Sequence, residues 1–293
     1  MASKTRLRRI AAIHDLSCVG KCSLTVALPV ISCTGVECCC IPTAVLSTHT
    51  GEFTGYTMTP LSQDMVPIAR HWKKEGVTLD GVYTGYLASP QQERQVEQVL
   101  DLLAGPQTLV VVDPVMADNG RFYANLDQTM CQAFVRLCGR AQLITPNITE
   151  AALLAGLPHP QAPHSRACLE QILDRLSRLG PRYIAVTGVH PEADQMGNLL
   201  LDTQTGKTAL ALRPVQPGVF YGTGDLFASA LSALLVRGLG ADKALDLATG
   251  LVADAIAISA QSSTPRRFGV AFEQALPAYM ARVQAAFGSG TSG

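Results

Sequence analysis

Short apolar runs alternate with longer segments of helical periodicity along most of the chain. The clearest strand signal is Leu109–Val112, a β-branched run that ends at Asp113-Pro114. A continuous apolar run bounded by turn residues is typical of a parallel strand covered on both faces. Further strands are predicted at residues 9–14, 36–46, 81–86, 141–145, 183–187, 197–201 and 208–212. The last two are close enough in sequence to form a hairpin.

Helical periodicity fills most of the intervals between these runs. It predicts helices at residues 21–33, 60–74, 90–103, 126–138, 148–155, 163–179, 224–237, 241–259 and 269–287. Pro60 stands at the first position of its helix, where proline is tolerated. Alternating strands and helices predict βαβ units with right-handed crossovers. We therefore expect a three-layer α/β/α fold with a central, mostly parallel sheet, in which 1–287 is a single domain and 288–293 a flexible tail.

Composition narrows the kind of partner. Of the 293 residues, 47% are apolar and 16% are charged, the opposite of a disordered chain. The 23 Lys and Arg balance the 23 Asp and Glu, so no basic surplus is available for a nucleic-acid backbone. A small-molecule site is the better expectation, with nucleic acid excluded as a partner.

The nine cysteines do not indicate a secreted or zinc-binding chain. The basic N-terminus is not followed by an apolar segment of signal length. Cys38-Cys39-Cys40 lies in an apolar stretch and is interpreted as core filling, and Cys18 and Cys22 lack the further Cys or His of a zinc site. No apolar run of membrane-spanning length lacks charges or turn residues. A soluble, cytoplasmic protein with no membrane partner is predicted.

Polar residues follow the predicted strands at one end. Because ligands bind at the carboxyl ends of the strands in such sheets, these residues are the candidates for a site. The candidates are Asp15, 47–51, Thr84-Gly85-Tyr86, Asp113 with Asp118, Thr145-Pro146-Asn147 and Thr187-Gly188.

The sharpest segment is Tyr221-Gly222-Thr223-Gly224-Asp225, which leads into an apolar helix. Two glycines let backbone N–H groups converge on an anion, and the helix N-terminus adds partial positive charge. The alternative is an ordinary helix start capped by Thr223 or Asp225. Neither a dinucleotide fingerprint, which needs glycine where Phe227 stands, nor a Walker A loop, which needs glycine where Asp15 stands, is present.

Together these motifs resemble the ribokinase-like superfamily, and within it the pyridoxal (pyridoxine, pyridoxamine) kinases. The resemblance covers roughly residues 10–260. It rests on Gly222-Thr223-Gly224-Asp225, Asp113-Pro114-Val115 with Asp118, Thr145-Pro146-Asn147 with Glu150, Ser47-Thr48-His49-Thr50, Thr84-Gly85-Tyr86 and Val219-Phe220-Tyr221.

The resemblance implies ATP-dependent phosphorylation of the 5′-hydroxymethyl group of a vitamin B6 vitamer. Asp225 would be the catalytic base, and Gly222, Thr223 and Gly224 the anion hole for the transferring phosphoryl group. The implied ATP-binding residues are Asp113, Asp118, Tyr123, Thr145, Asn147, Glu150 and Thr187. Of these, Asp113, Asp118 and Glu150 would serve Mg²⁺, Glu150 through water. A monovalent cation such as K⁺ and a homodimer are further expectations from the family.

On the substrate side the resemblance implies Asp15, Ser47, His49, Thr50 and Tyr86. A buried structural histidine is the alternative for His49. Asp15 departs from the family, which has serine there, and a carboxylate would accept from a protonated ring nitrogen or an amine. This substitution suggests a preference for pyridoxamine or a shifted ranking of vitamers. The segment 50–60 is either a lid over the substrate or an ordinary surface loop.

Two other functions remain open on sequence grounds. A hydroxymethylpyrimidine kinase of thiamine synthesis would share the fold, the base and the anion hole. A non-catalytic B6-binding protein would share the fold, but it would have no reason to retain Asp225 beside an intact glycine loop. A sugar kinase fits less well because the pocket candidates include Tyr86 and His49.

Overall fold

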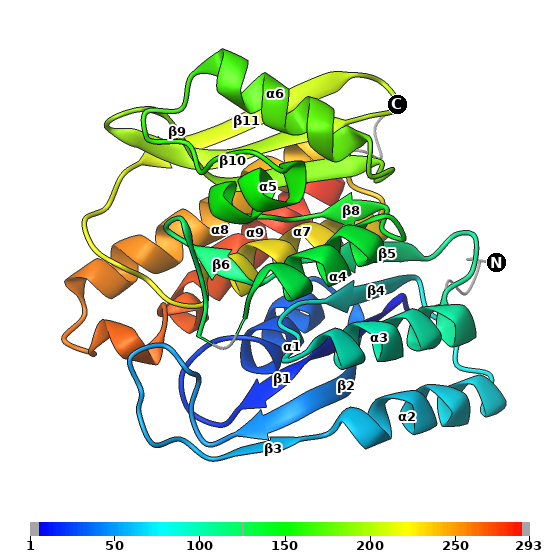
Figure 1. The fold of residues 1–293 in the computed structure, drawn as a ribbon. Coiled ribbons are helices and arrows are strands. Elements are labelled where there is room, and N and C mark those ends of the chain that lie inside the picture. Colours follow the sequence, from blue (N-terminus) through cyan, green and yellow to red (C-terminus); the bar gives the residue numbers. More distant parts are fainter. Residues whose placement is uncertain (1–5, 125, 289–293) are drawn as a thin grey trace.

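The computed structural model describes residues 6–124 and 126–288, which form a nine-stranded sheet between two layers of helices (Figure 1). The order across the sheet is β11-β10-β9-β8-β5-β4-β1-β2-β3. The strands are β1 (Arg9–Ser17), β2 (Glu37–Leu46), β3 (Met58–Pro60), β4 (Gly81–Thr84), β5 (Leu109–Val112), β8 (Leu143–Ile144), β9 (Tyr183–Glu192), β10 (Gln195–Asp202) and β11 (Lys207–Pro214).

The centre of the sheet is parallel and its two edges are antiparallel. Strands β2, β1, β4, β5, β8 and β9 pair in parallel, whereas β3 is antiparallel to β2 and the β10–β11 hairpin is antiparallel to β9. The predicted mostly parallel sheet and the predicted hairpin are both confirmed.

Helices cover both faces of this sheet (Figure 1). On one face lie α2 (Ser62–Lys74), α3 (Pro90–Leu103), α4 (Gln128–Cys138), α5 (Ile148–Ala155) and α6 (Arg166–Ser177). On the other lie α1 (Leu24–Cys33), α7 (Thr223–Val236), α8 (Ala241–Gln261) and α9 (Phe272–Gly288), with a short 3₁₀ turn η1 (Arg266–Phe268) before α9. The three-layer α/β/α architecture predicted from the sequence is confirmed.

The sheet separates two hydrophobic cores, and β1 shows how its sequence serves both. Successive side chains of a strand point to opposite faces. Ala11 and Ile13 pack into the core under α2–α6, whereas Ile10 and Ala12 pack into the core under α1 and α7–α9. All four are at most 1% exposed. This explains why the strand is apolar throughout rather than alternating.

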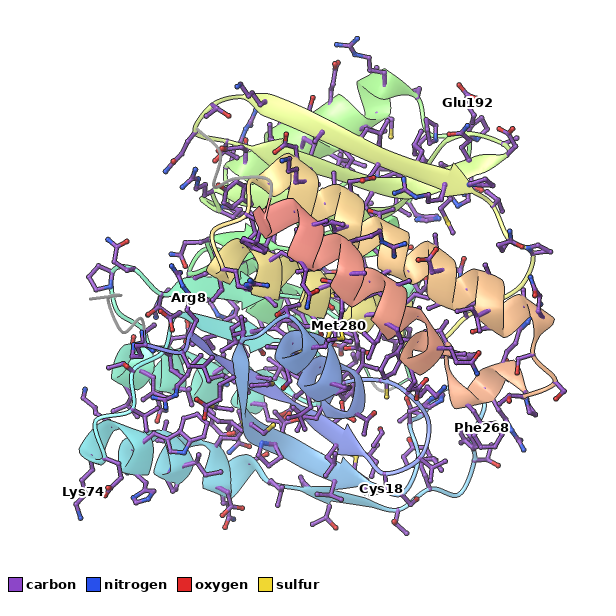
Figure 2. All side chains as sticks on the ribbon, turned by 180° about the vertical axis from the view of Figure 1, so that it is seen from behind. Arg8, Cys18, Lys74, Glu192, Phe268 and Met280 are labelled. Carbon is purple, nitrogen blue, oxygen red and sulfur yellow. The ribbon has the colours of Figure 1, made fainter. Side chains whose placement is uncertain are left out.

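Helix α8 is the one described helix that is long and apolar enough to cross a membrane, judged by length and composition. It packs against α7, α9 and the β10–β11 hairpin. Figure 2, the view from behind, shows it alongside α9 on the outer surface of that layer.

Three local predictions were wrong. Pro60 does not open a helix: it ends β3, an edge strand opposite Ala44, where the missing N–H is tolerated, and α2 starts at Ser62. Strand β1 runs on to Ser17, so Asp15 lies within the strand rather than after it. A small hairpin of β6 (Ala117–Asp118) and β7 (Arg121–Phe122) was missed.

Helix α9 extends one residue into the predicted tail. Gly288 belongs to α9, whereas the rest of the predicted tail, 289–293, lies outside the described residues.

Candidate active site

The carboxyl ends of the parallel strands meet at one edge of the sheet, as expected for this topology. Strand β1 ends at Ser17, β4 at Thr84, β5 at Val112 and β8 at Ile144. Figure 2 shows Cys18, which follows β1, on the opposite side of the molecule from Arg8, which precedes it. Most of the predicted site residues follow these strand ends or begin the helices after them.

Gly222 is held in a conformation that requires glycine. Its φ of +80° is left-handed, and a Cβ there would lie 2.0 Å from the carbonyl oxygen of Lys21. It is the N-cap of α7, and no side chain of the described residues caps the helix. The first N–H groups of α7 are therefore not consumed by a side-chain cap. The alternative in which Thr223 or Asp225 serves only as a cap is wrong.

Gly224 keeps the first turn of α7 open. The space a Cβ would enter there is empty of other described atoms to 4 Å. Thr223 Oγ1 turns back to the Phe220 carbonyl at 3.4 Å and leaves the turn unobstructed. A tetrahedral anion can therefore approach the backbone of this turn.

Asp225 stands in the first turn of α7 with its side chain 15% exposed. Burial and, to a smaller extent, the nearby Asp15 carboxylate raise the pKa of its carboxyl, the backbone N–H of Ser23 lowers it, and the resulting pKa is about 7. A carboxyl with a pKa near neutrality is suited to general base catalysis.

His14 lies 4.0 Å from Asp225, measured between Nδ1 and Oδ1, yet it is not an ion-pair partner. Burial lowers the pKa of His14 to about 3, so the ring is neutral at physiological pH. It packs edge-on against Tyr83, and a Cβ at Gly85 would lie 2.4 Å from the ring. Gly85 of the predicted Thr84-Gly85-Tyr86 motif is therefore required to admit the imidazole.

Asp15 is 5% exposed and accepts two hydrogen bonds from hydroxyl groups. Ser17 Oγ donates to Oδ2 at 3.0 Å and Ser23 Oγ to Oδ1 at 2.6 Å. Burial raises the pKa of Asp15, and both hydrogen bonds lower it. The Asp15 carboxylate adds to burial in raising the pKa of the half-buried Tyr86 phenol. Asp15 and Tyr86 are therefore close enough to influence each other electrostatically.

His49 is committed to the backbone on both sides of its ring. Nε2 lies 2.5 Å from the Arg267 carbonyl oxygen, and Nδ1 accepts from the Gly51 N–H at 3.0 Å. These partners assign the proton to Nε2. A Cβ at Gly20 would lie 2.1 Å from the ring, so the chain closes tightly around it. This geometry favours the structural alternative for His49 over direct substrate contact.

The segment after β2 is tied to the start of α7 and to η1. Ser47 Oγ accepts from the Thr57 N–H at 2.9 Å, and Tyr221 donates its hydroxyl proton to Glu52 at 3.0 Å. Phe53 stacks edge-on against Phe268, with ring centroids 5.4 Å apart. Thr50, the remaining substrate candidate on this segment, is exposed.

Glu150 is buried and its carboxylate is occupied by backbone donors. Oε2 accepts from the Asn147 N–H at 2.9 Å, and Oε1 from the Met116 N–H at 3.0 Å. Asn147 Oδ1 in turn accepts from the Glu150 N–H at 3.0 Å, which completes a capping box at the start of α5. Glu150 therefore links α5 to the chain after β5.

Asp113 follows β5 and is 5% exposed. Burial and the Asp225 carboxylate raise its pKa, and burial and Asp113 raise that of Glu150. Two buried carboxyls that repel each other are suited to sharing a cation or a proton. Among the described residues, no three acidic, His or Cys side chains converge closely enough to hold a metal ion by themselves. The oxygen donors fit Mg²⁺, which commonly keeps several waters and uses few protein ligands.

The remaining nucleotide candidates differ in exposure. Asp118 is exposed on β6 and accepts from the Asn119 N–H at 2.8 Å. Tyr123 is 40% exposed, and Thr145 is buried with its hydroxyl unpartnered within the described chain. Thr187 donates its N–H to the Pro146 carbonyl at 2.9 Å, which places β9 beside the start of α5.

Sequence reasoning missed three residues near Asp15. Ser17 and Ser23 hold its carboxylate, and the Cys22 thiol has its pKa raised by burial, Asp225 and Asp15. The one feature of the sequence that could have indicated these residues is the high number of small polar residues between the first strand and the first helix. Their contacts depend on how the chain turns there.

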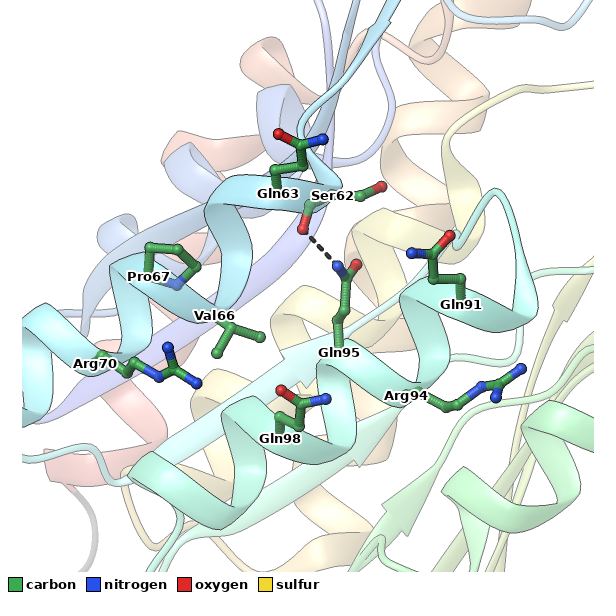
Figure 3. Close-up of a pocket in the computed structure, with 9 residues that line it drawn as sticks. All are labelled: Ser62, Gln63, Val66, Pro67, Arg70, Gln91, Arg94, Gln95 and Gln98. Atoms are coloured by element: carbon green, nitrogen blue, oxygen red, sulfur yellow. Dashed lines mark hydrogen bonds between the residues drawn. The ribbon is translucent and has the colours of Figure 1, made fainter.

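The groove drawn in Figure 3 is not part of this site. It lies between α2 and α3, and its nine lining residues include four glutamines, Arg70 and Arg94. None of the predicted site residues lines it. Its volume is about 570 Å³.

A model of the family described as phosphomethylpyrimidine kinase matches residues 27–267. A solved structure from Bacteroides thetaiotaomicron, provisionally named a phosphomethylpyrimidine kinase and crystallised with pyridoxal, is 36% identical with a TM-score of 0.88, over 94% of this chain and 96% of that chain. The pyridoxal kinase from Lactobacillus plantarum is 34% identical with a TM-score of 0.85, over 94% and 98% of the two chains.

A third similarity is to the hydroxymethylpyrimidine/phosphomethylpyrimidine kinase of Bacillus subtilis. It is 27% identical over 187 residues, which are 62% of this chain and 65% of that protein.

Proposed function

We propose that this chain, which belongs to the phosphomethylpyrimidine kinase family, uses ATP to phosphorylate the 5′-hydroxymethyl group of a vitamin B6 vitamer. The expected resemblance to the pyridoxal kinases of the ribokinase-like superfamily is confirmed by the similarity to solved structures. The choice among pyridoxal, pyridoxine and pyridoxamine belongs to the proposal.

The observation that carries the proposal is the position of Asp225 in the first turn of α7. With its pKa raised to about 7, the carboxylate is present in quantity at neutral pH and still basic enough to accept a proton. We assign it the proton of the substrate hydroxyl as that oxygen attacks the γ-phosphate of ATP.

The start of α7 supplies the second half of the chemistry. Backbone N–H groups at Thr223 and Gly224, together with the positive end of the helix, would stabilise the charge on the transferring phosphoryl group. The left-handed Gly222 sets the direction of this turn. Phosphoryl transfer needs positioning and charge stabilisation more than covalent chemistry. A base and an anion-binding helix start are therefore the kinds of group that the reaction requires.

Asp113 and Asp118 are proposed to lie beside the nucleotide phosphates, with Thr145, Asn147, Thr187 and Tyr123 around them. Asp113 and Glu150 would hold Mg²⁺, largely through water. Bound there, Mg²⁺ would neutralise phosphate charge. The chain has no net positive charge, so backbone N–H groups and a cation must do what basic side chains do in other phosphate-binding proteins.

Asp15 is proposed to set the preference for the acceptor. Its two serine donors favour the ionised carboxylate in a buried position. A protonated pyridine nitrogen or an amine would complement that charge. This supports a vitamer, and particularly one that carries an amine. We propose Tyr86 as a further contact with the ring, while Ser47 and Thr50 are proposed to border the opening.

A hydroxymethylpyrimidine kinase is the second candidate, favoured by the family description and by the Bacillus subtilis relative. Both acceptors carry a hydroxymethyl group on a flat nitrogen heterocycle. Release of ADP should be measured with pyridoxal, pyridoxine, pyridoxamine and hydroxymethylpyrimidine in parallel. We expect the highest kcat/KM with a B6 vitamer; a clear preference for the pyrimidine would overturn the proposed substrate.

A binding protein without catalysis is the third candidate. Asp225→Asn keeps the size of the side chain and removes the base, so we expect turnover to fall about 10²- to 10⁴-fold while pyridoxal binding persists. Turnover that survives the substitution would contradict the role of Asp225.

A further inference from the structure

Ser23 connects the two carboxyls on which the proposed reaction depends. It lies just before α1, between the strand that carries Asp15 and the helix layer that carries Asp225, and it is 5% exposed. Its hydroxyl donates to Asp15 Oδ1 at 2.6 Å. The Lys21 carbonyl, two residues earlier, lies against Gly222 at the start of α7, and the backbone N–H of Ser23 lowers the pKa of the Asp225 carboxyl.

The third polar group of Ser23 is also used. Its carbonyl oxygen accepts from the N–H groups of Val26 at 3.1 Å and Ala27 at 2.9 Å, which opens α1. The hydroxyl, N–H and carbonyl of one residue are thus directed at Asp15, Asp225 and the first turn of a helix. The orientation of Ser23 is fixed from three sides.

The backbone of Ser23 is strained. Its φ is 52° and its ψ is −130°, close to the first central position of a type II′ turn, which glycine dominates. A residue with a Cβ persists in such a conformation only where its surroundings over-determine it. Glycine would relieve the strain, yet it would remove the hydroxyl that holds Asp15. The side chain of Ser23 therefore supplies something that the turn alone does not require.

We propose that Ser23 is a positioning residue that holds Asp15 and Asp225 in one fixed arrangement, Asp15 through its hydroxyl and Asp225 through its backbone N–H. This inference rests on the proposed function of those two carboxyls. It couples the orientation of the acceptor substrate to the orientation of the base, because a shift of Ser23 moves both partners.

A substitution of Ser17 tests the contact with Asp15 separately from the contact with Asp225. The Ser17 hydroxyl also donates to Asp15, at Oδ2 and 3.0 Å, but no hydrogen bond within the described part of the chain joins it to Asp225, and it is not among the groups that shift the Asp225 pKa. A substitution of Ser17 therefore disturbs the acceptor side alone. Ser232 is a matched control away from both carboxyls: it is a fully buried serine of α7 whose hydroxyl donates to the Ala228 carbonyl of its own helix.

The test compares four variants of the full chain: Ser23→Ala, Ser23→Gly, Ser17→Ala and Ser232→Ala. Steady-state kcat and KM are measured with whichever acceptor the wild type uses best, and Tm is measured on the same samples. Ser23→Ala and Ser17→Ala should each raise KM for the acceptor about tenfold, because each removes a hydrogen bond to a charged group. Ser232→Ala should leave kcat and KM close to wild type.

Ser23→Gly should differ from Ser23→Ala in two ways. The freed backbone no longer aims its N–H at Asp225, so kcat should fall about tenfold in addition to the rise in KM. Its Tm should be higher than that of Ser23→Ala, because the left-handed strain is relieved. A variant that is more stable yet less active cannot be explained by a purely structural role.

Two results would overturn the inference while leaving the proposed function intact. One is a wild type that phosphorylates its acceptor together with Ser23 variants whose kcat and KM match Ser232→Ala. The other is a loss of activity in both Ser23 variants that simply follows a loss of Tm. A wild type that phosphorylates neither the vitamers nor hydroxymethylpyrimidine would instead overturn the proposed function, and the role of Ser23 with it.

Discussion

Burial of Asp225 makes its carboxylate a stronger base, and it lowers the stability of the folded protein at neutral pH. Its carboxyl is largely buried with no basic side chain among the groups that shift its pKa, so the folded protein holds a proton there more tightly than the unfolded chain does. A base of ordinary pKa would be a weaker proton acceptor. Burial of the ionised carboxylate in the first turn of α7 is therefore unfavourable for folding, but it provides the raised pKa that the proposed reaction needs.

This cost predicts a pH-dependent stability. A carboxyl with a raised folded-state pKa binds more protons in the folded state between its unfolded value and about 7, so its contribution to stability is lost as pH rises through that window. Asp225→Asn removes the charge, and we expect its Tm to exceed that of wild type at pH 8 by about 2–4 °C per kcal/mol recovered. The gain should disappear near pH 4, and differential scanning calorimetry at the two pH values measures it. An equal gain at both would contradict the raised pKa.

Gly222 is the second residue whose identity is dictated locally. Gly222→Ala introduces a Cβ 2.0 Å from the Lys21 carbonyl oxygen at a φ of +80°. We expect a loss of about 2 kcal/mol or more in the free energy of unfolding, together with a large loss of kcat. Denaturant unfolding and steady-state kinetics check this. Gly224→Ala, where the space is open, is the control and should unfold close to wild type.

At the scale of elements, local chemistry decided which predictions succeeded. Helix α5 was predicted with its true bounds because Asn147 and Glu150 form a capping box and Gly156 ends the helix in a left-handed conformation. The helix predicted from Pro60 failed because proline is compatible with both a helix start and an edge strand. The β6–β7 hairpin was not predicted because strands of two residues are too short to show a periodic pattern.

The segment between β2 and β3 packs as an element in its own right. Phe53 anchors it, with ring contacts to His49 and Phe268 and the Arg267 guanidinium 5.2 Å from its ring centroid. Phe53→Ala should loosen the segment without disturbing the sheet. We expect faster tryptic cleavage at Arg266 and Arg267 and a several-fold higher KM for the acceptor, since a loosened cover excludes water less well. If Phe53→Ala has the same cleavage rate and KM as the wild type, the segment is an ordinary surface loop and not a cover over the substrate.

At the scale of the whole molecule, the site is assembled from segments far apart in the chain. Asp15, Tyr86, Asp113, Glu150 and Asp225 belong to five separate segments that parallel pairing brings to one edge of the sheet. The predicted strand ends placed Asp15, Tyr86 and Asp113 at this edge, whereas Asp225 was predicted from the glycine-rich segment and Glu150 from the family resemblance. It did not predict that both ring nitrogens of His49 bind backbone groups, or that Glu150 caps α5, because these contacts arise only once the segments are packed.

Asp15 is the residue proposed to determine which vitamer the pocket prefers. Asp15→Ser removes the buried charge, and we expect kcat/KM for pyridoxamine to fall more than that for pyridoxal, by about tenfold relative to wild type. Competition kinetics with mixed vitamers measures the ranking. Arg282→Ala, at an exposed ion pair with Asp254, is a control that should leave it unchanged. An unaltered ranking in Asp15→Ser would remove Asp15 from the specificity of the pocket.

The activity proposed for this chain is phosphorylation of a hydroxymethyl group with Asp225 as the base. Incubation of the wild type and Asp225→Asn with ATP, Mg²⁺ and each vitamer, followed by ³¹P NMR, tests it most directly. We expect the phosphate-ester signal of a vitamer 5′-phosphate with the wild type, and its near absence with a folded Asp225→Asn that still binds the vitamer. No ester from the wild type, or equal ester from both proteins, would contradict it.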